Sequence, residues 1–181
     1  MVTLASLWLP ILLSAVAVFF LSFCMWMVLP HHKKDWVKLP DEEGVIGALK
    51  KMGAGPGQYG FPWGDKETMK DPEFMKRFME GPSGFVIVRP GYNLGKSRAI
   101  SFPYNLLLAV IVAYLATFTL NRLSEPMDVF RLVGTASILA NGAALGWGPI
   151  WFGRTWGSTL REMADAIAYG GATGLIFALM W

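Results

Sequence analysis

An all-α integral membrane protein is the fold class that this sequence predicts, with four transmembrane helices and a cytoplasmic segment of about 65–70 residues between helices one and two. Hydrophobic residues make up 54% of the chain and charged residues only 16%, which is far from the composition of soluble domains. All charged side chains fall in three stretches, residues 33–98, 122–131 and 154–165. The four uncharged runs between and around these stretches therefore predict the transmembrane helices.

The first transmembrane helix is predicted within residues 1–30. An α-helix rises 1.5 Å per residue, so about 20 apolar residues cross a hydrocarbon core of roughly 30 Å, and this run is long enough. No basic residue precedes Leu4 and no small-residue cleavage site follows the apolar stretch, so we expect an anchor rather than a cleaved signal peptide. Bulky side chains in its second half are expected to face lipid or partner proteins, and those assigned to a partner are Phe19, Phe20, Phe23 and Trp26.

The cytoplasmic segment, residues 31–98, is too long for a turn and too apolar in patches for a disordered tail. Short helices are predicted near 41–52 and 72–80, because an aspartate that can cap the first turn precedes each and a glycine follows each. Residues 53–64 are rich in glycine and proline, so we expect a loop that is neither helix nor regular strand. Residues 85–88 predict a short strand or extended segment.

A compact three-helix core is predicted over residues 99–181, with the first helix more peripheral. The last uncharged run, 166–181, has only 16 residues, so the fourth helix is expected either to end short and thin the bilayer locally or to extend back into the preceding charged stretch. Asp165 would then lie near the lipid headgroups. The three helices of this core are expected at residues 99–121, 132–153 and 160–181.

Small residues predict how these helices pack. Apolar burial does not drive helices together in lipid, so residues that let two backbones approach closely mark the packing faces. The fourth helix has such residues at four-residue spacing, and the third has a similar line with an asparagine beside it. The residues predicted to pack are Ala166, Gly170, Gly174 and Ala178 on the fourth helix and Ser137, Asn141 and Ala144 on the third.

Lysine and arginine residues predict the orientation. Twelve lie between helices one and two, two between helices two and three, and two between helices three and four. With the first and third connections in the cytoplasm, 14 of the 16 basic residues lie inside, as the positive-inside rule requires. We therefore expect a bacterial inner-membrane protein with a cytoplasmic large loop and both termini outside. Headgroup contacts are expected from His31, His32, Lys33, Lys34, Trp36, Lys96 and Arg98.

No catalytic, cofactor or metal site is predicted. None of the four uncharged runs contains an ionisable side chain, which argues against a pump or proton-coupled transporter. His31 and His32 are the only histidines, and adjacent residues on a helix point about 100° apart, so we do not expect them to share a metal. Residues 91–97 resemble a nucleotide-binding P-loop but are one residue short, and nine acidic residues in the large loop argue against nucleic acid. Arg161 and Asp165 are expected to pair along one helix.

Three segments carry a family resemblance. Residues 27–43, 57–63 and 71–77 resemble a family of uncharacterised bacterial inner-membrane proteins, and the likeness runs along the whole chain. The resemblance implies a polytopic membrane fold. It carries no function and no site residues.

The predicted function is that of a non-catalytic accessory subunit of a larger membrane complex, of the respiratory or photosynthetic energy-transducing kind. Such a subunit would bind other integral membrane subunits and lipids, and would contact cofactors only where neighbouring subunits hold them. An alternative is a small transporter or channel that passes an uncharged solute along Asn105 and Asn141. A lipid-modifying enzyme is a third possibility, but the chain lacks a recognisable nucleophile beside a base.

Overall fold

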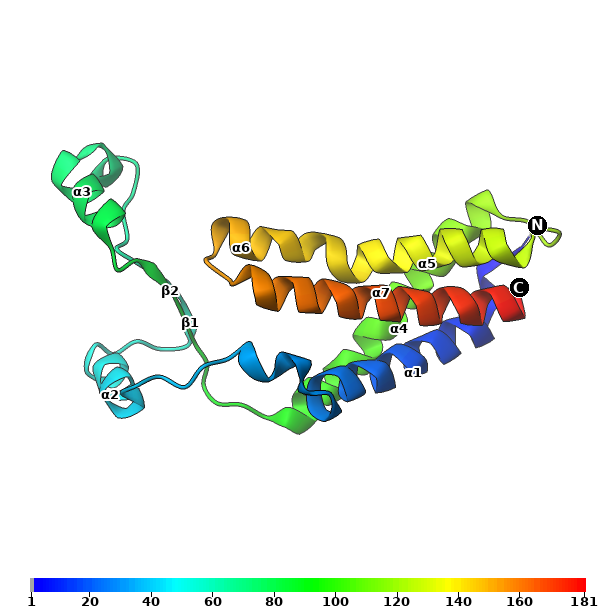
Figure 1. The fold of residues 1–181 in the computed structure, drawn as a ribbon, viewed down its shortest axis with the longest axis horizontal. Coiled ribbons are helices and arrows are strands. Elements are labelled where there is room, and N and C mark those ends of the chain that lie inside the picture. The colour runs from blue at the N-terminus through cyan, green and yellow to red at the C-terminus, as the bar shows by residue number, and fades with distance from the viewer. Residues whose placement is uncertain (1) are drawn as a thin grey trace. The chain divides into compact units, whose positions relative to one another are not determined.

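The computed structural model describes residues 2–181 (Figure 1). Helices make up 72% of these residues. The chain divides into two compact units, which we call the helical unit (residues up to Trp36 together with Asn93–Trp181) and the insert (Val37–Tyr92). Within residues 2–181, four helices are long and apolar enough to cross a membrane, as predicted, and they are Leu4–Val28, Leu94–Thr119, Pro126–Trp151 and Trp156–Met180.

The first of these helices changes its winding along its length. It begins with the 3₁₀ turn Leu4–Leu7, continues as α1, Trp8–Phe23, and ends with the π-helical turn Cys24–Val28. Leu29 is extended because it precedes a proline, which disfavours helical backbone angles. The chain then forms a separate 3₁₀ turn, Pro30–Lys34, which carries both histidines.

Three further long helices complete the helical unit. They begin at capped positions or at a proline and run nearly without interruption. The third of the four changes from α to 3₁₀ winding before its last turns. Their bounds are Leu94–Thr119 for α4, Pro126–Gly142 for α5, Ala143–Gly146 for the 3₁₀ turn, Trp147–Trp151 for α6 and Trp156–Met180 for α7.

Helix α7 begins four residues before the expected start at residue 160. The Thr155 side chain accepts a hydrogen bond from the Ser158 backbone N–H, which satisfies a donor of the first turn and fixes the start there. Asp165 therefore lies nine residues inside the helix, about 14 Å along its axis. The candidate span Trp156–Met180 thus contains a carboxylate.

The backbones of helices α5 and α7 pack closely against each other. A Cβ added at Gly174 would lie 2.9 Å from the Phe130 carbonyl oxygen and 3.0 Å from the Gly134 Cα. A Cβ at Gly170 would lie 2.7 Å from the Gly134 carbonyl oxygen. Of the other residues predicted to pack, Ala166 and Ser137 are buried, Ala178 and Asn141 are half-buried, and Ala144 is exposed. The change to 3₁₀ winding at Ala143 alters the direction in which Ala144 points.

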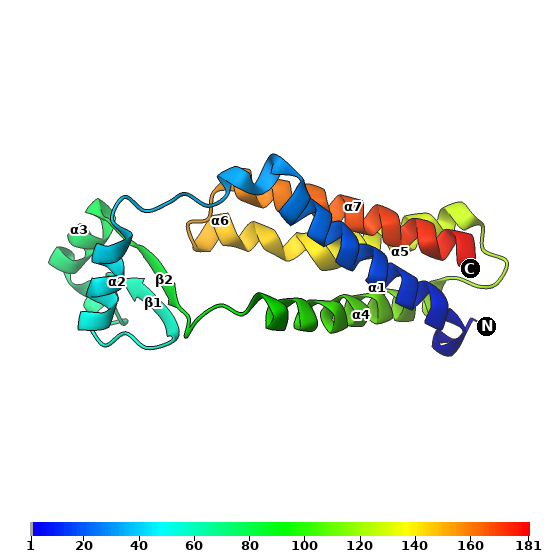
Figure 2. The same cartoon turned by 90° about the horizontal axis from the view of Figure 1, so that it is seen from below.

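The first helix belongs to the bundle rather than to its edge. α1 packs against both α4 and α7 (Figure 2). Leu7 and Ile11 join one buried apolar cluster with residues of all three other long helices, among them Val112, Val133 and Phe177. The first helix was expected to be peripheral, but its small and branched side chains, among them Ala15 and Val18, are buried in the bundle.

The insert contains two short helices and one two-stranded sheet. The predicted helical turns form as expected, with Asp41 accepting from the Gly44 N–H at 2.8 Å and Asp71 from the Glu73 N–H at 3.0 Å. The elements are α2, Glu42–Lys51, β1, Gly57–Phe61, α3, Pro72–Glu80, and β2, Gly84–Val88.

Strand β1 lies in the stretch expected to be an irregular loop. It pairs antiparallel with β2, with Tyr59 opposite Val86. The prediction of no regular strand at residues 53–64 was wrong, because a partner strand 27 positions later supplies the hydrogen bonds that the glycine-rich sequence alone does not favour.

Candidate functional site

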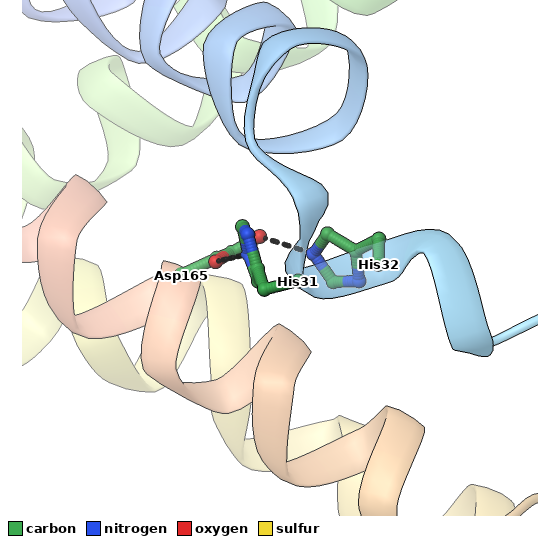
Figure 3. Close-up of side chains that lie close together, drawn as sticks. All are labelled: His31, His32 and Asp165. Carbon is green, nitrogen blue, oxygen red and sulfur yellow. Dashed lines mark hydrogen bonds and ion pairs between the residues drawn. The ribbon is translucent and has the colours of Figure 1, made fainter.

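Two histidines and an aspartate meet where the 3₁₀ turn Pro30–Lys34 lies against α7 (Figure 3). His31 Nε2 lies 3.0 Å from Asp165 Oδ1, and His32 Nε2 lies 2.8 Å from Asp165 Oδ2. Adjacent side chains diverge on such a turn, but the carboxylate has two oxygens and offers one to each ring. One aspartate of α7 therefore gathers both histidines of the chain.

A second carboxylate extends the cluster. His32 Nδ1 lies 2.5 Å from Asp35 Oδ2, and Arg161 donates from Nε to Asp35 Oδ1 at 2.7 Å and also from a terminal nitrogen. The order of contacts is Arg161, Asp35, His32, Asp165, His31. We call these five residues the junction cluster. It ties the end of the first helix to α7 entirely within the helical unit.

The centre of the junction cluster is shielded from solvent. The side chains of Asp35, His32 and Asp165 are only 1%, 3% and 5% exposed, whereas His31 and Arg161 are about one third exposed. The Trp26 ring stacks on the His32 ring with the two planes 5° apart and the centroids at 4.0 Å. Buried charges need partners, and each of these charges has at least one.

The contacts favour the doubly protonated form of the His32 ring. Both of its ring nitrogens face carboxylate oxygens, which only accept hydrogen bonds, so both nitrogens carry a proton. Burial lowers the pKa of His32, but the hydrogen bonds and charges of Asp165 and Asp35 outweigh it and raise that pKa overall. Burial likewise raises the pKa of Asp35, but hydrogen bonds from His32 and Arg161 outweigh it and hold that pKa below its usual value.

Three features of the junction cluster were not predicted from the sequence. Arg161 pairs with Asp35 and not with Asp165, because the turn after Pro30 brings Asp35 against α7. His31 and His32 share one carboxylate. Asp165 is buried and lies inside a candidate span, whereas the uncharged run that begins at residue 166 had suggested a place near the lipid headgroups.

Sequence reasoning missed Asp35 altogether. Its position three residues after His32 is the one local signal, since residues three apart lie on one side of a 3₁₀ turn. Nothing local links either residue to α7, which lies more than 120 positions later.

The junction cluster has the donor set of a metal site. His31, His32 and Asp165 each offer one ligand atom, and these atoms lie within 4.8 Å of one another. Imidazole nitrogen with one carboxylate suits the first-row transition metals rather than Mg²⁺ or Ca²⁺.

Most of the other residues predicted to contact lipid headgroups or partners lie on the surface of the helical unit. Arg98 places its guanidinium 5.4 Å from the centroid of the Phe23 ring, and Phe19 packs edge-on against Phe102. The exposed members of the predicted headgroup and partner sets are Lys33, Lys34, Trp36, Lys96, Arg98, Phe20, Phe23 and Trp26.

A second polar feature lies within the bundle. Hydroxyl and amide side chains from α1, α4, α5 and α7 line a small recess of about 10 Å³, which is at most enough space for one water molecule. The Ser14 hydroxyl, 1% exposed, has no hydrogen-bond partner within residues 2–181. Asn141 donates to the Ser137 carbonyl oxygen at 2.8 Å. The polar lining residues are Ser14, Asn105, Ser137, Asn141 and Thr173.

No family model matches this sequence, and no curated protein or solved structure matches it. The resemblance to uncharacterised inner-membrane proteins therefore stays a prediction.

Proposed function

We propose that this protein is a multi-pass membrane protein that acts as a non-catalytic accessory subunit of a larger membrane assembly. One observation carries the proposal. In the insert, every residue of which the structure describes, Phe74 is the one buried side chain. Large apolar side chains in the insert are exposed, and they are Val37, Leu39, Val45, Ile46, Met52, Tyr59, Phe61, Trp63, Met69, Met79, Phe85, Ile87 and Tyr92.

An insert with this surface is suited to lie against another surface. It consists of two short α-helices, the 3₁₀ turn Thr68–Lys70 and a two-stranded sheet, which are too few to enclose a hydrophobic core. Contiguous exposed apolar surface on a protein marks a contact with a membrane or with another protein. The insert lies outside the four candidate spans, so the bilayer core does not account for its apolar side chains.

Charge favours a protein partner over a lipid surface for the insert. Residues 37–92 carry eight basic and eight acidic side chains, so the insert has no net charge that would draw it to anionic lipid. The basic excess lies in the flanking residues, with Lys33 and Lys34 on one side and Lys96 and Arg98 on the other. The flanks are suited to headgroups and the insert to a neutral, partly apolar protein surface.

The proposed orientation in the membrane follows from the positions of the lysine and arginine residues. In a bacterial inner membrane, the insert and the short connection at 152–155 lie on the cytoplasmic side and both termini lie on the outer side. The host assembly is of the energy-transducing kind, respiratory or photosynthetic, and the chain fills space, bridges subunits and holds lipids. Any cofactor that it contacts through this surface belongs to a neighbouring subunit.

Native mass spectrometry of the protein extracted gently from its own membranes tests this proposal. We expect the full chain to carry at least one protein partner. Replacing Trp63 and Met79, which are 80% and 79% exposed, by serine removes that partner without loss of helix content. A charge-neutral control on the same insert, Glu43→Ser with Lys66→Ser, retains it. A wild-type chain that is monomeric, or that carries lipid alone, contradicts the proposal.

The polar lining of the recess, rather than its size, supports a second candidate function, passage of a small uncharged solute. It brings Asn105 and Asn141, which are 36 positions apart, to one polar site between the helices. Glycerol or urea flux into proteoliposomes tests this candidate. Flux that is lost on Asn141→Leu supports it, and flux no faster than that of protein-free liposomes contradicts it.

A further inference from the structure

We propose that His31, His32 and Asp165 form a binding site for a divalent transition-metal ion of the Zn²⁺ class. The site consists of two imidazole nitrogens and one carboxylate, and it goes beyond the scaffold function proposed above. Its three protein ligands come from two segments of the chain, the turn Pro30–Lys34 and α7. A bound ion would therefore join these two segments directly.

The ligand spacing fits such an ion. Ligand bonds to Zn²⁺ are about 2.0–2.2 Å for histidine and carboxylate, so neighbouring ligand atoms lie roughly 3–3.5 Å apart. The two distances from histidine to Asp165 are 3.0 Å and 2.8 Å. All three ligand atoms already lie within 4.8 Å, so a small movement of the two rings closes the site.

The surroundings of His32 are those of a metal ligand. Histidines that bind metals usually donate their second ring N–H to a carboxylate or carbonyl, which fixes the orientation of the ring and the nitrogen that faces the metal. Here Asp35 holds Nδ1 at 2.5 Å, so Nε2 is the nitrogen left for an ion. Arg161 in turn holds Asp35, and Trp26 covers one face of the ring. The ligand is thus oriented before any ion binds.

Charge and protons balance when the ion enters. Without an ion, His32 and Arg161 carry two positive charges and Asp35 and Asp165 two negative charges. A divalent ion displaces the Nε2 proton of His32 to solvent, and the Nε2 proton of His31 moves to Nδ1 of the same ring. The cluster then gains one net positive charge. Three protein ligands leave at least one coordination position for water or a small anion.

The metal class follows from the ligand types. Imidazole suits Zn²⁺, Cu²⁺, Ni²⁺ and Fe²⁺, whereas Mg²⁺ and Ca²⁺ prefer sites made entirely of oxygen. We therefore expect Zn²⁺ to bind in the presence of millimolar Mg²⁺.

Zinc titration of the full chain in detergent, purified through a tag without histidine and stripped with a chelator, tests the site. Cys24 is a free, exposed thiol and a possible adventitious ligand, so every protein carries Cys24→Ser. We expect one tightly bound Zn²⁺ per chain by competition with a chromophoric chelator. Asp165→Asn and His31→Gln weaken binding by more than about 100-fold, because loss of an outer partner alone costs roughly 10–100-fold.

Glu162→Gln is the matched control. Glu162 lies on the same helix one turn before Asp165 and pairs with Arg154, outside the proposed site, so its loss leaves zinc affinity unchanged. The proposal is overturned if the Cys24→Ser chain binds no zinc at one equivalent, or if Glu162→Gln and Asp165→Asn weaken binding equally.

A measurement on the Cys24→Ser protein, which carries no other substitution, does not depend on whether the other variants fold. X-ray absorption at the zinc edge should show a four- to six-coordinate ion with scattering from two imidazoles. A spectrum without imidazole scattering overturns the site even if every variant fails to fold.

Discussion

At the scale of single residues, the junction cluster brings together buried charges of the helical unit. Four charged side chains and one more histidine are joined by contacts of 2.5–3.0 Å, and three of the five are almost fully buried. Removing one member of a buried ion pair leaves its partner charged and desolvated, which costs more than the pair itself contributes. The cluster is therefore expected to behave as one unit when its members are replaced.

A double-mutant cycle on Asp35 and Arg161 checks this behaviour in metal-free protein. We expect Asp35→Ala to lower the free energy of unfolding by about 3–5 kcal/mol, because it leaves Arg161 and His32 without their shared carboxylate. Arg161→Met should cost less, since His32 still pairs with Asp35. The double variant should be more stable than the sum of the two effects predicts, by about 0.5–3 kcal/mol. Additive effects in thermal unfolding would show that the two side chains do not interact.

At the scale of elements, the sequence predicts the long helices better than it predicts where they begin. Uncharged length and small-residue spacing are local properties, so the four long helices and the contact through Gly170 and Gly174 follow from them. The early start of α7 depends on one threonine cap, and the pairing of β1 with β2 depends on a distant partner. The histidine site depends on a contact across more than 130 positions, which no local pattern contains.

The close approach of α5 and α7 makes a prediction about one glycine. Gly174→Ala places a methyl group against two backbone atoms at 2.9 Å and 3.0 Å, so the helices must separate. We expect it to destabilise the protein by about 1–3 kcal/mol. Gly171→Ala is the control on the same helix, because nothing lies within 4 Å of its added Cβ. Alanine also has a higher helix propensity than glycine. Equal melting temperatures for the two variants in detergent would contradict this packing.

At the scale of the whole molecule, two kinds of surface account for the proposed role. The helical unit has four helices of membrane length within residues 2–181, and the insert has apolar side chains without a core of its own. A lipid environment suits the first surface and a protein partner suits the second. Both assignments require that the insert lies on one side of a bilayer that the helices cross.

Cysteine labelling in intact cells tests that requirement most directly. In a Cys24→Ser background, Leu123→Cys reports the connection between α4 and α5, where Leu123 is 91% exposed, and Lys66→Cys reports the insert. We predict that a membrane-impermeant thiol reagent labels Leu123→Cys from outside and labels Lys66→Cys only after the membrane is opened. Labelling of both positions from the same side would contradict four crossings with the insert in the cytoplasm.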